Sequence, residues 1–328
     1  MITKGKFVIS LDFELMWGMR DKKTIKQYGE NIIGVHAVIP RLLEMFTVFD
    51  IEATFSTVGF LFFKSKTELL NNIPLKKPHY NDSNLSPYEE YFDKIGEHCK
   101  EDLYHYAPTL IELIKSYPNQ EIGTHTFSHY YCLEEGQTID TFKQDLVYAK
   151  KVADKIDIQI SSLVFPRNQF NEEYLNICNE LGIICYRGNE HSWLYKAKNG
   201  EKESLFRRAC RLIDAYINIT GHNCYSNEFI NSTTPLNVPA SRFLRPYSKR
   251  LQILDLLKLE RIKSGMSHAA KHNLTYHLWW HPHNFGINQE ENFLFLKKIL
   301  LHFKLLQNKY GYQSLTMTNL AKQIRNEQ

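Results

Sequence analysis

The fold prediction depends on the stretch Phe7-Val8-Ile9-Ser10-Leu11-Asp12-Phe13-Glu14. Its apolar part, from Phe7 to Leu11, has the length of a buried strand. Asp12 and Glu14 are two positions apart, so in a strand their side chains project from the same face while Phe13 points into the core. The stretch therefore predicts a strand that brings two acids to one site at its carboxyl end. A pair of solvated acids at a strand end is the alternative.

Apolar runs of strand length recur outward from this one, and helical patterns lie between them. We expect further strands at 53–58, 121–123, 162–165, 183–186 and 274–280, and helices at 35–49, 109–117, 139–153, 172–181 and 292–306. This alternation predicts an α/β fold with a parallel sheet or barrel. Because no repeat or flexible linker divides the chain, we expect one domain over residues 1–328.

Two regions interrupt the alternation, at about 64–106 and 222–250. Both are polar and rich in turn-forming residues. We expect them to be long loop insertions on one face of the scaffold, where lids and substrate contacts are commonly found.

The composition excludes several classes of protein. With 328 residues, 43% of them hydrophobic, the chain can bury a large core. A net charge of +4 from 40 basic and 36 acidic residues is too small and dispersed to indicate nucleic-acid binding. The six cysteines form no CxxC pair, and no run reaches the roughly 18 uninterrupted apolar residues of a membrane span. The start of the sequence also lacks the pattern of a signal peptide, so we expect reduced thiols, no transmembrane segment and a cytoplasmic location.

Three pairs of histidines are spaced four positions apart: His125 with His129, His268 with His272, and His277 with His281. In a helix this spacing puts both rings on one face, where they can bind one divalent ion. His268 and His272 end a basic helical segment and are expected to be solvated. His277 and His281 lie in an apolar strand, where they are far apart, although the one at the strand end could serve as an acid. The pair 125/129 is therefore the best candidate for a metal site.

Two histidines and a carboxylate that leave positions open for water and substrate form a familiar hydrolytic metal site. The metal polarises an acyl carbonyl and lowers the pKa of bound water, a carboxylate removes the proton, and a histidine protonates the departing amine. The sequence offers two acids, two metal histidines and one further histidine, which is the set that this scheme requires.

Four segments together resemble carbohydrate esterase family 4, the NodB-like polysaccharide deacetylases. That family has a strand ending in Thr-Phe-Asp-Asp-Gly, a His-x-x-x-His metal pair, a motif with Arg and Pro, and a histidine after a late strand. The corresponding segments here are Ser10 to Glu14, His125 to His129, Phe165-Pro166-Arg167-Asn168-Gln169, and Leu278 to Pro282.

The resemblance implies a distorted (β/α)7 barrel with a divalent metal ion, usually zinc, at the carboxyl ends of the strands. It implies that His125 and His129 bind the metal and that Asp12 is the catalytic base. By the same correspondence Arg167 orients this base and His281 is the general acid.

Two departures from the family pattern leave alternatives open. Phe13 stands where the family has its second Asp, so either Glu14 is the third metal ligand, which we favour, or Asp12 is the ligand and the base lies elsewhere. The third motif reads Pro-Arg-Asn, so Arg167 could instead form a structural ion pair.

Other residues could line a substrate pocket. Arg187, His191 and Trp193 follow a predicted strand and could lie near a sugar, with ordinary loop packing as the alternative. Arg242 and Arg245 occupy a polar loop and suit recognition of a phosphate, with solvated arginines as the alternative.

These features predict a metal-dependent hydrolase that removes an N-acyl group, most simply N-acetyl, from an amino sugar. A lipid- or nucleotide-linked intermediate of bacterial surface polysaccharide synthesis would fit the expected location and the two arginines. The alternatives are a hydrolase of a non-sugar C–N bond, such as a cyclic amide or ureide, and a non-catalytic carbohydrate-binding barrel. The sequence leaves the sugar, the metal and the oligomeric state open.

Overall fold

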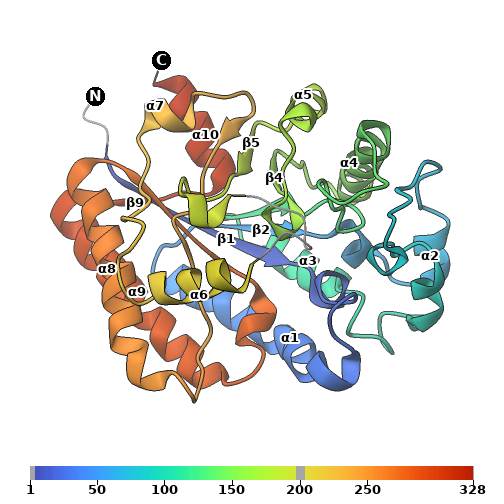
Figure 1. Cartoon of the computed structure of the whole chain (residues 1–328), viewed down its shortest axis with the longest axis horizontal. Helices are drawn as coiled ribbons and strands as arrows, with labels where there is room; N and C mark the ends of the chain where they lie inside the picture. The colour runs from blue at the N-terminus through green and yellow to red at the C-terminus, as the bar shows by residue number, and fades with distance from the viewer. Residues whose placement is uncertain (1–3, 197–203, 328) are drawn as a thin grey trace.

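The protein is described by a computed structural model that covers residues 4–196 and 204–327. The strands in this range form one parallel sheet in the order β6-β5-β4-β3-β2-β1-β8-β7, with β9 beside the start of β1 (Figure 1). Their bounds are β1 Lys6–Phe13, β2 Ala53–Thr57, β3 Gln120–Thr124, β4 Ser162–Val164, β5 Cys185–Arg187, β6 Leu236–Asn237, β7 Arg242–Phe243, β8 Thr275–Trp280 and β9 Gln313–Ser314.

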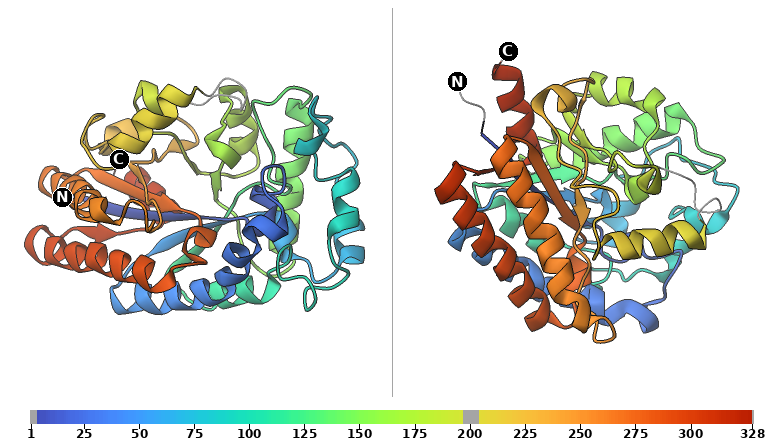
Figure 2. Two further views of the ribbon diagram at one scale, coloured as in Figure 1. Left: turned by 60° about the horizontal axis from the view of Figure 1, so that its bottom comes forward. Right: turned by 60° about the vertical axis from the view of Figure 1, so that its left-hand side comes forward.

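The sheet curls into an incomplete barrel. No pairing joins β6 to β7 within the described residues, so the barrel is open between its two edge strands. The helices lie around the outside of the sheet (Figures 1 and 2). The predicted α/β class and distorted (β/α) barrel are confirmed in this open form.

The helices follow the predicted alternation with shifted ends. The helix predicted at 35–49 begins earlier, at Ile25. The helices α2, α6, α7 and α10 were not predicted, and α8 was expected only as the basic helical segment that ends at His272. The bounds are α1 Ile25–Val48, α2 Lys66–Leu70, α3 Pro108–Lys115, α4 Ile139–Asp154, α5 Glu172–Glu180, α6 Leu205–Asp214, α7 Asn227–Ile230, α8 Asp255–His272, α9 Gln289–Tyr310 and α10 Met317–Asn326.

β1 lies in the middle of the sheet and is buried along its whole length. Its odd-numbered side chains, such as Phe7 and Phe13, belong to the large core beneath the outer helices. Val8 belongs to a second core cluster with Leu236 of β6 and Met317 of α10. Because side chains alternate along a strand, Ser10 and Asp12 continue the face of Val8 towards the carboxyl end of β1.

Of the helices that the structure describes, α1 is the one whose length and apolar composition would allow it to cross a membrane. Its buried side, which includes Ile32, Val35 and Leu42, packs into the core. At Gly34 the helix approaches the backbone of Gly286 so closely that a Cβ atom would lie 2.0 Å from the Gly286 carbonyl oxygen. This contact holds α1 against the short 3-10 helix η9 (Pro282–Phe285), which follows β8.

The two predicted insertions differ from each other. Region 64–106 is irregular apart from α2 and two short 3-10 helices, as expected of a loop. Region 222–250 was expected to be a loop only, but it contains α7 and the strands β6 and β7. These strands have two residues each, too few for alternation to be detected in the sequence, so the prediction was wrong there.

Candidate active site

The site lies at the carboxyl end of β1. Asp12 and Glu14 are both 3% exposed, and they lie two positions apart on the same side of the chain. Phe13, between them, is fully buried in the core, as the alternation predicted. The two acids are therefore buried polar groups rather than solvated ones.

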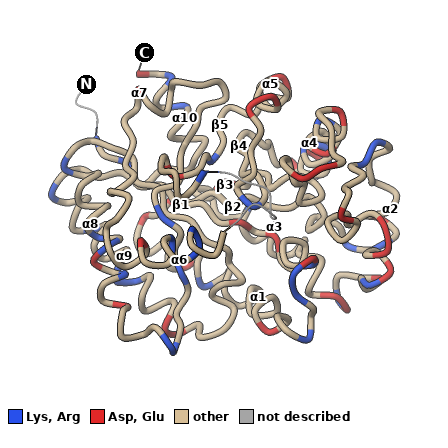
Figure 3. The backbone as a smooth tube through the Cα atoms, viewed as in Figure 1, with Lys and Arg blue, Asp and Glu red and all other residues tan. Residues whose placement is uncertain are grey.

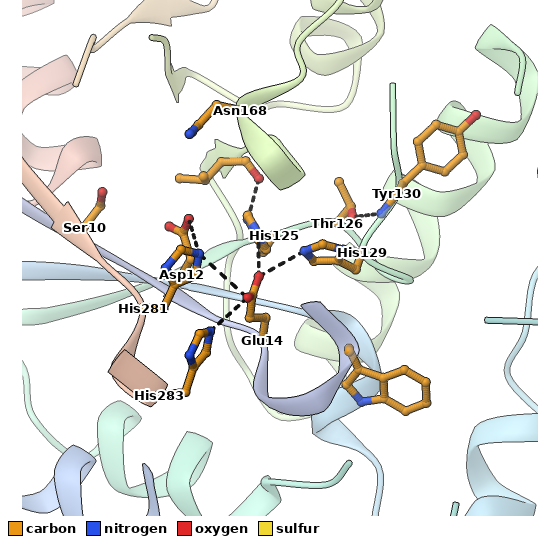
Figure 4. Close-up of polar contacts among 12 residues, drawn as sticks. Ser10, Asp12, Glu14, His125, Thr126, His129, Tyr130, Asn168, His281 and His283 are labelled. Carbon is orange, nitrogen blue, oxygen red and sulfur yellow. Dashed lines mark hydrogen bonds and ion pairs between the residues drawn. The ribbon is translucent and has the colours of Figure 1, made fainter. Parts of the chain in front are cut away.

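Four imidazole rings surround the Glu14 carboxylate (Figure 4). The Nε2 atoms of His125 and His129 lie 3.3 and 3.0 Å from its Oε2 atom. On the other side, the Nε2 atoms of His281 and His283 lie 3.7 and 3.1 Å from Oε1. One carboxylate thus joins a histidine pair that follows β3 to another that follows β8.

His125 and His129 lie on a loop after β3, not on a helix, so the helical spacing argument was wrong although the pairing it suggested is present. Thr126 and His129 have φ values of 63° and 60°, which turn the loop back on itself. The carboxylate of Asp145 on α4 accepts hydrogen bonds from the backbone N–H groups of Phe127 and Ser128, at 2.7 and 3.2 Å. The turn brings the two ring centroids to 5.1 Å from each other.

The donor set formed by Glu14, His125 and His129 fits a divalent metal ion. The ligand atoms all lie within 4.8 Å of one another. His125 Nδ1 donates a hydrogen bond to the Val164 carbonyl at 2.8 Å, so in the neutral ring the lone pair is on Nε2, facing the Glu14 carboxylate. Two acceptors that face each other in a buried site repel, and a cation between them satisfies both. In metal-binding histidines, the ring nitrogen that does not bind the metal typically donates a hydrogen bond in this way, for example to a backbone carbonyl.

The charges of the site depress the pKa values of its acids. Burial by itself would raise the pKa of Glu14, but His281 and the polar contacts of the three other histidines around it hold it well below the ordinary value. Burial also lowers the pKa of His129 to about 4, although Glu14 opposes this shift. Glu14 is therefore ionised and His129 neutral at pH 7, which are the protonation states that metal ligands require.

Asp12 is held by Arg187 and not by the predicted Arg167. The two guanidinium nitrogens of Arg187 donate to the two Asp12 oxygens at 2.7 and 2.8 Å, and they also donate to Ser10 Oγ and Asn168 Oδ1. Burial raises the pKa of Asp12, but Arg187 and His125 outweigh it and keep the pKa below the ordinary value. Asp12 is therefore an ionised carboxylate in a fixed orientation.

Two arginine predictions are corrected by these contacts. Arg167 forms an ion pair with Asp21 and lies over the Tyr131 ring, with its Cζ atom 4.3 Å from the ring centroid. Its ion-pair partner is Asp21 and not Asp12, so the alternative of a structural ion pair applies to it. Arg187, expected to contact a sugar, is 1% exposed and its guanidinium group is engaged by Asp12.

His281 and His277, the pair predicted within one strand, have different surroundings. His277 is fully buried, and burial lowers its pKa to about 3. His281 begins the turn after β8 and keeps 23% of its side chain exposed. Its Nε2 atom lies 3.7 Å from both Asp12 and Glu14, while its Nδ1 atom lies 3.3 Å from Asn284 Oδ1. His281 is thus the histidine of this pair that can reach a substrate.

A pocket of about 290 Å3 opens beside His281. Trp279 and Phe243 give it aromatic surface, and its only acid within the described residues is the buried Glu190. Five cationic side chains also line it: Arg167, Lys196, Arg211, Arg242 and Arg245.

The remaining substrate candidates divide between two pockets. His191 and Trp193 line a neighbouring pocket of about 640 Å3, which shares Asn189, Glu190 and Lys196 with the first. Arg242 was expected in an open polar loop, but it is 3% exposed and paired with Asp214, which makes it chiefly a structural residue. Arg245 makes no ion pair with any described residue. An arginine that binds a ligand needs a guanidinium group that no acid of the protein already engages.

His283 was not predicted as part of the site. Its Nε2 atom lies 3.1 Å from Glu14 Oε1 and its Nδ1 atom lies 2.8 Å from the Tyr28 hydroxyl of α1. The third histidine of His281-Pro282-His283 was visible in the sequence, but only the η9 turn shows that it faces Glu14. Glu14, His281 and His283 form a second group of residues that could hold a metal ion. His268 and His272 lie on α8.

Solved structures of other proteins share the fold of this chain at low sequence identity. No family model matches the sequence, and no curated protein matches it. A solved structure of a provisionally assigned polysaccharide deacetylase from Mycobacterium smegmatis covers 99% of this chain and 92% of its own, with a TM-score of 0.60 and 11% identity. The allantoinase PuuE matches with a TM-score of 0.54 and 9% identity, over 97% of this chain and 89% of its own. A 4-alpha-glucanotransferase from Thermococcus litoralis matches with a TM-score of 0.53 and 10% identity, over 97% of this chain but 40% of its own.

Proposed function

We propose that this chain, which has the fold of the NodB-like polysaccharide deacetylases, is a metal-dependent hydrolase that removes an N-acyl group, most simply acetyl, from an amino sugar. The observation that carries the proposal is the joint arrangement of two acids in different environments. Glu14 lies among histidines that could bind a metal ion with it. Asp12 is held in a fixed orientation by Arg187, 175 positions further along the chain, and lies beside His281.

The residues of the chain divide the reaction between them. A divalent metal ion bound by Glu14, His125 and His129, which we propose to be zinc, would supply Lewis acidity to the acyl carbonyl and the attacking water. Asp12 accepts the proton of this water, because Arg187 keeps it ionised and fixes its oxygens. His281 donates a proton to the amine as the C–N bond breaks, and the products are a carboxylate and a free amino sugar.

The pocket supports a sugar as the substrate. Trp279 offers an aromatic face, and Asn168, Asn189 and Glu190 offer polar groups for hydroxyls. The two adjoining pockets, of about 290 and 640 Å3, share three residues and together offer more volume than a small cyclic amide needs. This argues against the allantoinase-like alternative, although that enzyme has a similar fold.

Arg245 supports a phosphate on the substrate. Burial lowers its pKa, and the nearby Arg211 and Arg242 act in the same direction. A guanidinium group in such surroundings, without an acidic partner among the described residues, is stabilised by an anionic ligand. We therefore propose a sugar linked through phosphate to a carrier, as in the synthesis of a bacterial surface polysaccharide. A cytoplasmic location remains a prediction.

Acetate release from three kinds of compound tests this proposal. We expect the metal-loaded protein to hydrolyse N-acetylhexosamine 1-phosphates faster than the neutral N-acetylhexosamines, and not to hydrolyse allantoin. Replacing Arg245 by Met should raise KM for the phosphorylated sugar about tenfold or more, since a hydrogen bond to a charged group is worth roughly 1.5–3 kcal/mol. The neutral sugar serves as the control, because its KM should not change.

Two outcomes would contradict the proposal. Turnover of allantoin alone would favour the non-sugar alternative. Absence of turnover with all three compounds, in protein shown to contain metal, would favour a non-catalytic carbohydrate-binding barrel.

A further inference from the structure

Helix α6 presents apolar side chains to the solvent. Leu205 is 78% exposed and Phe206 is 69% exposed, and both lie in its first turn. The exposed apolar residues continue through the helix and the turn after it, at Leu212, Ile213, Ile217 and Ile219. In the left view of Figure 2, α6 lies at the upper edge of the molecule with no other helix above it. A helix that only covered the core would turn these residues inward.

The charges on α6 are of one sign at its surface. Between Ser204 and Thr220 the only acid is Asp214, which is buried and paired with Arg242. The exposed charge is Arg208, and Arg211 is partly exposed. In Figure 3 the blue segments of Lys and Arg gather around α6. The helix thus combines an apolar surface with a basic one.

The same surface includes an exposed tryptophan. Trp193, in the 3-10 helix η6 (Trp193–Tyr195), is 63% exposed. The buried guanidinium group of Arg207 on α6 donates to the carbonyl oxygens of Trp193, Leu194 and Lys196, at 2.9 to 3.0 Å. Arg207 therefore ties η6 to α6, so that Trp193 and the exposed face of the helix move as one unit.

The start of α8 adds to this surface. Arg261 of α8 donates to the Asp214 carbonyl at 3.3 Å, which fixes α8 against the end of α6. Burial raises the pKa of Tyr216, and Asp255 at the first turn of α8 is close enough to raise it further. Four exposed residues, two basic and two apolar, precede or begin α8: Lys249, Arg250, Ile253 and Leu256.

The surface adjoins the candidate active site. Arg211 and Ala215, from α6 and the residue after it, line the same pocket as His281. A partner that covered α6 would therefore lie at the mouth of this pocket.

We propose that α6, with Trp193 and the start of α8, docks on a lipid bilayer that contains anionic phospholipids. An apolar helical face bordered by basic residues, with Phe, Leu and Trp exposed, is typical of helices that lie in the membrane interface. Basic residues close to a leaflet that contains anionic lipids are attracted to its surface. The docking surface is independent of the reaction. Its consequence, that the phosphate carrier is a lipid rather than a nucleotide, rests on the proposed function.

Sedimentation with vesicles tests the docking. We expect the full chain to pellet with vesicles of phosphatidylcholine and phosphatidylglycerol, and less with phosphatidylcholine alone. The double variant Phe206→Ser/Ile213→Ser should reduce binding about a hundredfold or more, because it removes two apolar side chains from the bilayer contact. The matched control is Leu294→Ser/Leu305→Ser on α9, whose leucines are 59% and 66% exposed. It should bind as the wild type does.

A second variant, Arg208→Glu, changes an exposed side chain that is not part of the core. A loss of binding in this variant is therefore not caused by misfolding. The variant should weaken binding to the anionic vesicles and leave the far-UV circular dichroism spectrum unchanged. The proposal is overturned if the wild type stays in the supernatant, if the α9 control loses binding equally, or if ultracentrifugation shows that α6 instead joins two copies of the chain.

The soluble N-acetylhexosamine 1-phosphate separates this proposal from the proposed function. Hydrolysis that persists in the α6 double variant, together with vesicle binding that is lost, supports both. Hydrolysis without vesicle binding by the wild type overturns the docking alone. Vesicle binding by metal-loaded wild type without hydrolysis of any sugar leaves the docking surface standing and overturns the proposed function.

Discussion

Replacing Asp12 by Asn should lower kcat for acetate release about a hundred- to ten-thousandfold, the usual contribution of a general base. Asn has nearly the same shape and can accept hydrogen bonds from Arg187 through its one carbonyl oxygen, but it cannot take a proton from water. The change is measured by steady-state kinetics on the N-acetylated sugar phosphate at saturating metal.

The metal content of the same variant decides between the roles of the two acids. We expect Asp12→Asn to keep its metal, because Asp12 is engaged by Arg187, and Glu14→Gln to lose it, because Glu14 is the carboxylate between the histidines. If Asp12→Asn lost metal and Glu14→Gln kept it, Asp12 would be the ligand and the base would lie elsewhere.

Replacing Arg187 by Met should lower the free energy of unfolding by about 3–5 kcal/mol, because it leaves the buried Asp12 carboxylate without its partner. The comparable variant Arg167→Met should cost less. Its partner Asp21 keeps two further cations close by, Arg20 and Lys22. Denaturant unfolding of both variants and the wild type measures the difference.

A double variant separates the ion pair from the packing of Arg187. Asp12→Asn/Arg187→Met removes both charges, so its loss of stability should be smaller than the sum of the two single losses. Two results would mean that Arg187 is not the essential partner of Asp12. One is a loss of stability in the double variant equal to the sum of the losses in Asp12→Asn and Arg187→Met, and the other is a larger loss from Arg167→Met than from Arg187→Met.

The sequence revealed the scaffold of the site because its strands are continuous apolar runs. Buried parallel strands have this pattern, so β1, β2 and β8 could be placed within one or two residues of their bounds. The strands β6 and β7 have two residues each and carry no such pattern. The early part of α1 was missed because its glycines and polar residues conceal a helix, although Gly34 is required where the helix meets Gly286.

The site was predicted best where its residues are near one another in the chain. The histidines at 125 and 129 were paired from their spacing, although a loop held by Asp145 rather than a helix brings them together. The partner of Asp12 could not be found in this way. Arg187 is separated from it by 175 positions and ends β5, which lies four places from β1 in the sheet order, so only the curl of the sheet brings the two side chains into contact.

Elemental analysis of the purified protein tests whether Glu14, His125 and His129 hold a metal ion, with the wild type compared with His125→Ala and His129→Ala. The proposed site predicts near-stoichiometric divalent metal in the wild type and its loss in both variants, since each removes one of three protein ligands. A wild type that holds no metal after incubation with zinc, cobalt or manganese would contradict the claim, and so would variants that keep it.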